Sequence, residues 1–212
     1  SEEEIEEIEV FGQRLAAHFL ANNTQVSRVI IDIFETSWKR IKFDGAEHDI
    51  SFVKGSGEKH TAKITAGRNN LTVESGVEDL IVLKTTKSGF VGYIKDNFTT
   101  LPETADRIFS TAIEAMWRYS NADAATDAVF QNIRQKILMV FADHDSLSVQ
   151  HTLYAMGEAI LNQFSEVEEI AFSLPNIHCL PIDMTKFGQA NDNRIFVPTD
   201  EPHGLIEARL TR

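Results

Sequence analysis

The sequence predicts an α+β fold, in which an antiparallel β-sheet carries helices on one face. Three observations support this prediction. A helical pattern at the start gives way to a long β-rich stretch, and two adjacent helical patterns are then followed by further strands. Short connections join the β-stretches, which favours an antiparallel meander. The 212 residues are 42% hydrophobic and 25% charged, so they can bury the core of one large domain or two small ones.

The first predicted element is an amphipathic helix over residues 4–21. Its apolar side chains recur at helical spacing: Ile5, Ile8, Leu15 and Phe19. Asn22 and Asn23 follow as stop signals. Acidic residues cluster in the first turns, where they complement the helix dipole, and we interpret them as a solvated face.

The pattern changes to β over residues 24–86. Branched and aromatic residues are dense over residues 26–38, and shorter alternating stretches follow, punctuated by Gly and Asn, over residues 50–54, 60–66, 71–74 and 80–84. Residues 107–119 read as another strand, because their β-prone residues also alternate. We therefore expect a meander ahead of the two central helices.

Two helices are predicted over residues 124–142 and 148–164, and the short loop between them makes them antiparallel neighbours. Strands finish the chain over residues 169–174, 177–184, 194–197 and 205–210. After about Leu80 the order of elements forms one complete unit of two strands, two helices and two strands. The helix and meander before it look like the back half of a similar unit, so we divide the chain into residues 1–79 and 80–212.

Composition narrows the classes of function. The 20 Lys and Arg residues are outnumbered by 32 Asp and Glu residues, and the net charge of −12 argues against a nucleic-acid partner. Cys179 is the single cysteine, which excludes an intramolecular disulfide and favours a reducing compartment; we interpret it as a small buried apolar residue. No apolar run reaches the roughly 18 residues of a spanning helix, so we expect a soluble intracellular protein without a membrane partner. The histidines lack the spacing of a metal site.

Residues 84–108 contain an aromatic ring, Phe90, and a guanidinium, Arg107. An aromatic ring can stack on a flat heterocycle, while Arg can grip a carbonyl or anionic edge with two hydrogen bonds. Taken singly, each residue has a plainer interpretation. Phe90 after a glycine is more typical of a loop anchored in the core, and Arg107 beside Asp106 and Glu103 is more typical of a surface ion pair.

A second stretch, residues 173–178, contains Asn176 and His178 on either side of Ile177. In an extended segment their side chains share one face, where a carboxamide and an imidazole could hold a small molecule and move its proton. The alternative is a turn at Asn176 and a core hydrogen bond at His178.

Ser148, Val149 and Gln150 open the second central helix. Free backbone N–H groups and a carboxamide could face a carbonyl edge there. The alternative is that Ser148 only caps the helix while Gln150 lies in solvent.

Taken together, these motifs occur in the order and with the spacing of the urate oxidase (uricase) family, which the chain resembles over nearly its whole length; the matching runs are residues 83–96, 99–101, 106–108, 173–178 and 203–208. The resemblance implies the tunnelling fold (T-fold), with antiparallel sheets backed by helices and four subunits around a tunnel, this chain supplying one partial and one complete unit. It also implies oxidation of urate by O₂ and water to 5-hydroxyisourate and hydrogen peroxide in purine catabolism, without metal or organic cofactor.

The resemblance also implies roles for individual residues. Phe90 would stack on the purine ring and Arg107 would grip its pyrimidine edge. The backbone N–H of Val149 and the carboxamide of Gln150 would hold the opposite edge. Together with Asn176, these four residues would make up the substrate-holding part of a site between subunits of a homotetramer.

On the oxygen side, the resemblance implies that Asn176 lies over the ring in the oxygen or peroxide pocket and that His178 belongs to a proton relay. The family's first unit carries a Lys and a Thr that act as base on urate, and nothing in this chain matches them; Lys84 and Thr86 belong to a different motif. We therefore expect the missing N-terminal segment to lie outside this chain, in a separate chain or an absent front, and the chain alone to be inactive.

Two alternatives remain within this reading: a pterin-processing T-fold enzyme, and a catalytically silent purine-binding or structural subunit. The expected location is the cytoplasm in a bacterium, and the peroxisome is possible in a eukaryote. The family's usual C-terminal tail is not matched, so the sequence leaves a targeting signal undetermined.

Overall fold

The computed structural model describes residues 7–199, 201 and 203–212. Its strands are β1 (Arg28–Phe43), β2 (Ala46–Gly67), β3 (Leu71–Lys84), β4 (Phe109–Tyr119), β5 (Val167–Ile177), β6 (Cys179–Pro181), β7 (Phe196–Pro198) and β8 (Leu205–Thr211). Its helices are α1 (Ile8–Asn22), α2 (Asp127–Asp143) and α3 (Val149–Gln163), with short 3₁₀ turns η1 (Ala122–Ala124) and η2 (Thr185–Phe187). Residues 4–6 of the predicted first helix lie outside the described residues.

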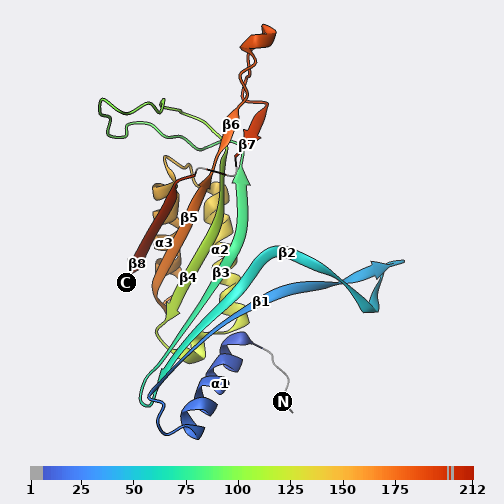
Figure 1. The fold of residues 1–212 in the computed structure, drawn as a ribbon, viewed down its shortest axis with the longest axis vertical. Helices are drawn as coiled ribbons and strands as arrows, with labels where there is room; N and C mark the ends of the chain where they lie inside the picture. Colours follow the sequence, from blue (N-terminus) through green and yellow to red (C-terminus); the bar gives the residue numbers. More distant parts are fainter. Residues whose placement is uncertain (1–6, 200, 202) are drawn as a thin grey trace.

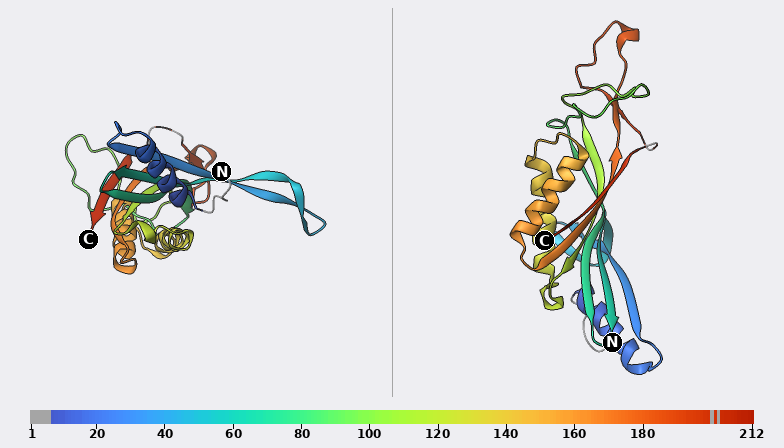
Figure 2. Two further views of the ribbon diagram at one scale, coloured as in Figure 1. Left: turned by 90° about the horizontal axis from the view of Figure 1, so that it is seen from below. Right: turned by 90° about the vertical axis from the view of Figure 1, so that its left-hand side faces the viewer.

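One antiparallel sheet forms the body of the molecule, in the order β1-β2-β3-β4-β5-β8 (Figure 1). The helices α2 and α3 lie together against one side of it (Figure 2). The helix α1 shares that side, because Glu9 of α1 hydrogen-bonds to His60 of β2 and the His60 ring stacks on Phe130 of α2. The predicted α+β plan, with helices on one face of an antiparallel sheet, is confirmed.

The core lies between this sheet face and the helices. Along β4 the buried side chains alternate with more exposed ones, as expected for a half-buried strand. The Trp117 ring is fully buried and lies 5.7 Å from the ring of Phe130 in α2. Close packing also requires small residues: a Cβ at Gly157 of α3 would stand 2.8 Å from Leu210 of β8.

Helix caps fix where α2 and α3 begin. The Thr126 hydroxyl accepts a hydrogen bond from the backbone N–H of Val129, and the Ser148 hydroxyl accepts one from His151. Caps of this kind satisfy backbone donors that a first turn leaves free. The two predicted helices are confirmed to within three residues at each end. No described helix has the length and apolar character needed to cross a membrane.

The predicted meander is wrong in its number of strands. The stretches over residues 50–54 and 60–66 are parts of one strand, β2, and those over 71–74 and 80–84 are parts of β3. The strand β2 continues because it pairs with β1 across two bulges. Gly76 lies inside β3, where a Cβ would stand 2.5 Å from the Ala115 carbonyl oxygen, so it permits close strand approach and not a turn. The proposed boundary between residues 79 and 80 falls within β3, at Asp79 with φ 56°.

The end of the sheet also differs from the prediction. The strand β5 continues through Pro175 to Ile177, whereas the predicted strand over residues 177–184 is reduced to β6. The following loop is organised by Asn191 instead, whose amide donates to the carbonyl oxygens of Ile182 and Ile195 at 2.8 and 2.7 Å. These bonds hold the loop together beyond the short ladder of β6 with β7.

The first-turn acids of α1 are not all solvated, because Glu9 is 1% exposed. Its carboxylate shares a hydrogen bond with the Nε2 atom of His60 at 2.8 Å and accepts another from the Ser75 hydroxyl. The prediction of a solvated acidic face is therefore wrong at this position. Two hydrogen-bond partners far away in sequence, His60 and Ser75, account for the difference.

Three segments project from the body: the outer half of the β1–β2 hairpin, the loop between β3 and β4, and the loop between β6 and β7 (Figures 1 and 2). They carry large exposed apolar side chains, among them Phe43 at 70%, Ile50 at 81% and Phe98 at 88% exposure.

Candidate functional site

A cavity of about 520 Å³ opens where the loop after β3, the start of α3 and the end of β5 meet. Every residue that the sequence singled out for a site lines it: Phe90, Arg107, Val149, Gln150, Asn176 and His178. They come from three segments of the chain that the fold brings together. Their substrate roles stay predictions, but their convergence in one cavity is a property of the structure.

The wall that carries Phe90 and Arg107 is held by backbone hydrogen bonds. Phe90 exchanges two of them with Thr104, at 2.7 and 3.1 Å, and the Arg107 N–H donates to the Ser88 carbonyl oxygen at 2.7 Å. The Phe90 ring stacks on Tyr93 with centroids 4.6 Å apart, and the Arg107 guanidinium carbon lies 5.5 Å from the Phe90 centroid. The ring and the guanidinium thus form one preorganised surface.

The Arg107 guanidinium makes no ion pair with any residue that the structure describes, and its Nε atom is buried without a hydrogen-bond partner. Its neighbour Asp106 is engaged elsewhere, because its carboxylate accepts from the Thr86 hydroxyl at 2.9 and 3.0 Å. Burial lowers the pKa of Arg107, but a guanidinium remains charged at neutral pH. The surface ion pair is therefore not formed, and the positive charge is available to a ligand.

The opposite wall is the start of α3. Ser148 caps the helix as the plainer interpretation expected, accepting from the His151 N–H at 3.1 Å. Val149 is 3% exposed, and its N–H has no hydrogen-bond partner in the described part of the chain. Gln150 is exposed, yet it lines the cavity. Capping and a ligand-facing helix start therefore occur together.

Asn176 and His178 reach the cavity from the end of β5. Asn176 pairs with Thr111 and its N–H donates to the Gly204 carbonyl oxygen at 2.8 Å, so it lies in a strand and not in a turn. The His178 ring has no hydrogen bond among the described residues. Burial, followed by the charges of Arg107 and His203, lowers the pKa of His178 below the usual 6.5. Its imidazole is therefore neutral at pH 7 and able to take up a proton.

Sequence reasoning missed the apolar part of the cavity lining, which includes Leu101, Leu180, Phe196 and Ile206. These residues lie on separate segments and have no shared sequence signal. Cys179 also differs from its prediction, because the free thiol is partly exposed and lines the cavity. Lys84 lies outside the lining: its ammonium donates to the carbonyl oxygens of Phe141, at 3.4 Å, and of His144.

Chemically, the cavity can hold a flat, anionic heterocycle. It offers one ring for stacking, one unpaired guanidinium, amide donors and a neutral imidazole. Over the described ranges, no three His, Cys, Asp or Glu side chains come together in a way that could hold a metal ion.

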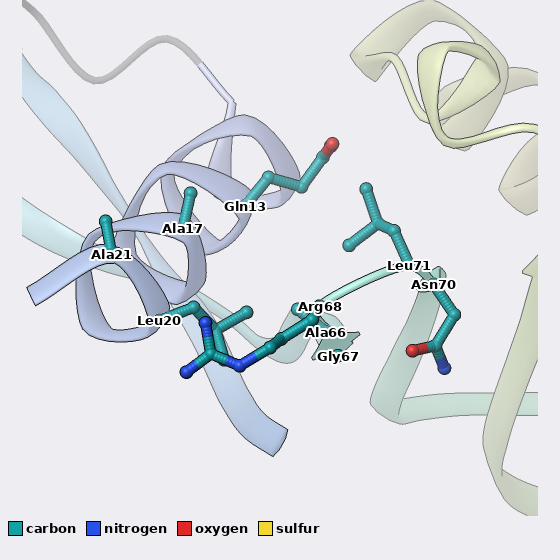
Figure 3. A pocket seen from close by; sticks show the side chains of 9 residues that line it. All are labelled: Gln13, Ala17, Leu20, Ala21, Ala66, Gly67, Arg68, Asn70 and Leu71. Atoms are coloured by element: carbon teal, nitrogen blue, oxygen red, sulfur yellow. The ribbon is translucent and has the colours of Figure 1, made fainter. Parts of the chain in front are cut away.

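A second hollow, between α1 and the turn after β2, has a different character (Figure 3). It is lined mainly by small and apolar side chains. Its one charged side chain, Arg68, donates to the carbonyl oxygens of Thr24 and Val26 at 2.8 and 2.9 Å. These bonds anchor the loop that joins α1 to β1 and leave no preorganised group for chemistry.

Known proteins that are similar to this chain are uricases. The Uricase family model matches residues 73–207. The uricase of Oryctolagus cuniculus is 40% identical over 215 residues, which cover 98% of this chain and 72% of that protein. The uricase of Arthrobacter globiformis is 38% identical over 204 residues, covering 96% and 66%.

Solved structures give the same result. The crystal structure of uricase from Arthrobacter globiformis matches with a TM-score of 0.93 and 38% identity, covering 98% of this chain and 71% of that chain. Urate oxidase from Bacillus sp. TB-90 matches with a TM-score of 0.81 and 25% identity, covering 97% and 72%. The family match spans more than half of the chain, and relatives near 40% identity span almost all of it: the chain belongs to the uricase family.

Proposed function

We propose that this protein is a urate oxidase, which oxidises urate with O₂ and water to 5-hydroxyisourate and hydrogen peroxide and uses no metal or organic cofactor. One observation carries the proposal within the uricase family. The half-buried guanidinium of Arg107, which has no ion-pair partner among the described residues, lies 5.5 Å from the Phe90 ring centroid in a cavity of about 520 Å³. Urate is a flat anion, so it needs a stacking ring and a positive charge together.

In this proposal Phe90 stacks on the purine and Arg107 binds its pyrimidine edge. The free N–H of Val149 and the carboxamide of Gln150 bind the opposite edge. These donors stabilise an electron-rich urate anion, and preorganised donors lower the cost of building up charge during reaction. Their location in one cavity supports the assignment.

Asn176 and His178 act on the oxygen side. Urate gives up two electrons to O₂, which leaves as hydrogen peroxide, while water supplies the hydroxyl group of 5-hydroxyisourate. Asn176 lies over the ring in the oxygen or peroxide pocket. His178 passes protons, a role supported by its lowered pKa and neutral ring.

We further propose that the site is completed by another subunit of a homotetramer. The two acids of the cavity are already engaged, Glu103 with the Gly92 N–H and Lys95, and Asp106 with Thr86. Neither acid is therefore free to take urate's proton, which supports a second subunit as the source of that base. Exposed Phe43, on the projecting hairpin, supports burial against a partner. Sedimentation of the intact protein tests this, with a tetramer expected and a monomer contradicting it.

The location follows from the host: cytoplasm in a bacterium and peroxisome in a eukaryote. The matched relatives include a bacterial and a mammalian uricase. Imaging of the tagged protein in its own host is the direct test.

Activity is tested by following loss of urate absorbance, oxygen uptake and peroxide release together in the intact protein. We expect all three in equal amounts, and their loss in Arg107→Ala. The matched control is Arg209→Ala, since Arg209 pairs with Glu169 at 2.9 Å and is absent from the cavity lining. Urate binding without oxygen uptake would indicate a silent purine-binding subunit, and oxidation of a pterin but not urate would indicate a pterin enzyme. Either result contradicts the proposal.

A further inference from the structure

Ser146, in the turn between α2 and α3, connects the two walls of the cavity. Its carbonyl oxygen accepts from the Gly89 N–H at 2.8 Å, and its own N–H donates to the Lys87 carbonyl oxygen at 2.9 Å. Through these bonds Ser88 and Ser146 form a short parallel bridge. Gly89 directly precedes Phe90, so the turn is tied to the wall that carries the stacking ring.

The Ser146 side chain makes the connection to the other wall. Its hydroxyl donates to the carbonyl oxygen of Ser148 at 3.0 Å and accepts from the Thr152 hydroxyl at 2.7 Å. Ser148 is the cap of α3 and directly precedes Val149. Ser146 is 2% exposed and Thr152 is 0% exposed, so water does not compete for these bonds.

Arg107 depends on the same linkage. Its N–H donates to the carbonyl oxygen of Ser88, the residue that bridges to Ser146. The Phe90 ring, the Arg107 guanidinium and the start of α3 are therefore all connected through Ser146, whose hydroxyl is bonded to that of Thr152. Neither Ser146 nor Thr152 belongs to the cavity lining, so neither touches a bound molecule.

We propose that Ser146 and Thr152 are positioning residues, which set the separation between the Phe90–Arg107 wall and the Val149–Gln150 wall and thereby the affinity for urate. The proposal rests on the urate oxidase function proposed above. A flat substrate that is stacked on one wall and hydrogen-bonded by the other tolerates little displacement, since both interactions depend steeply on distance. The hydroxyl chain acts through those walls and takes no part in the chemistry.

The test is Thr152→Val, which keeps the side-chain shape and removes the hydroxyl that donates to Ser146. We expect the Kd for urate, measured by calorimetry without oxygen, to rise about fivefold, the loss expected of one ordinary hydrogen bond. We expect kcat at saturating urate to change less than about twofold, because the reacting groups remain. Thr152→Ser keeps a hydroxyl at the same place and should restore the wild-type Kd.

The matched control is Thr126→Ala, which removes the cap at the other end of α2. It should lower the melting temperature and leave the Kd unchanged. An unchanged Kd in Thr152→Val, or a Kd that rises equally in Thr126→Ala, overturns the positioning role while wild-type activity keeps the proposed function intact. A wild-type protein that neither binds nor consumes urate overturns the function itself, and the positioning role with it.

Discussion

Two groups of polar side chains lie in different regions of the sheet and differ in whether their charges are paired within the chain. The α1 cluster, made of Glu9, His60, Ser75 and Tyr119, joins α1 to β2, β3 and β4. Its Glu9 carboxylate is hydrogen-bonded by His60 and Ser75. In the cavity, the Arg107 guanidinium has no acidic partner among the described residues. The carboxylate of Glu9 is therefore paired within the described chain, whereas the guanidinium of Arg107 is not.

The difference separates a group that stabilises the fold from a group kept for a ligand. A buried charge is costly unless it is paired, and in the α1 cluster Glu9 finds its partners, His60 and Ser75, within the chain. Burial raises the pKa of Glu9, but the hydrogen bonds from His60 and Ser75 outweigh it, and the net pKa lies below the usual 4.5. In the cavity nothing offsets burial, which lowers the pKa of Arg107 and of His178. Uncompensated groups of this kind mark functional sites.

Arg107→Ala should have the largest effect of the changes considered. The loss of a two-pronged, charge-assisted contact should cost about 4 kcal/mol of transition-state binding, so kcat/KM for urate should fall about 10³-fold. The melting temperature should change little, since the half-buried guanidinium has no ion-pair partner among the described residues whose loss would destabilise the fold. A fall in melting temperature as large as that of Glu9→Ala would contradict the distinction.

Glu9→Ala is the opposite experiment. It leaves His60 without its buried partner, and removing one member of such a pair should lower the free energy of unfolding by about 3 kcal/mol. The Kd of the folded protein for urate should not change, because Glu9 is absent from the cavity lining. Urea titration with parallel calorimetry measures both. Glu35→Ala, at a solvent-exposed side chain 3.8 Å from His60, is the control and should have little effect.

Phe90→Ala tests the stacking wall. Removal of a ring that stacks on a base should cost about 2 kcal/mol, so the Kd for urate should rise about 30-fold. Calorimetry without oxygen measures this change. Tyr93→Ala is the control behind the ring: it should raise the Kd less than Phe90→Ala does, because Tyr93 contacts Phe90 and is absent from the cavity lining. An equal effect of both changes would show that Phe90 does not face the substrate.

The smallest expected effect is a pH dependence of stability. Because the folded pKa of Glu9 lies below 4.5, its contribution is fully present above the unfolded pKa and is lost as the pH falls through the folded value. The free energy of unfolding should therefore fall more steeply below pH 4.5 in the wild type than in Glu9→Gln. Parallel curves for the two proteins would show that Glu9 does not titrate differently on folding.

The local sequence pattern predicted the helices well, because helical periodicity and caps such as Thr126 and Ser148 depend only on residues close together in the sequence. Strand number was wrong where β2 continues through two glycines, since pairing with β1 overrides a local turn signal. Glu9 was misjudged for a similar reason: its partners His60 and Ser75 lie 51 and 66 residues away.

The six candidate site residues were found as motifs, but only their family resemblance joined them into one site. Ser146 and Thr152 carried no sequence signal, because an ordinary Ser and Thr become a linkage only when the turn between α2 and α3 meets the loop after β3. Contacts of this kind depend on the tertiary fold and not on local spacing.

In the proposed function, the Arg107 guanidinium, which has no ion-pair partner among the described residues, binds urate. A crystal structure of the intact protein with urate, grown without oxygen, tests it most directly. We expect urate stacked on Phe90, with Arg107 N–H groups donating to its edge at about 2.8 Å. Urate bound away from Phe90, or Arg107 turned to a protein carboxylate while urate is bound, would contradict it.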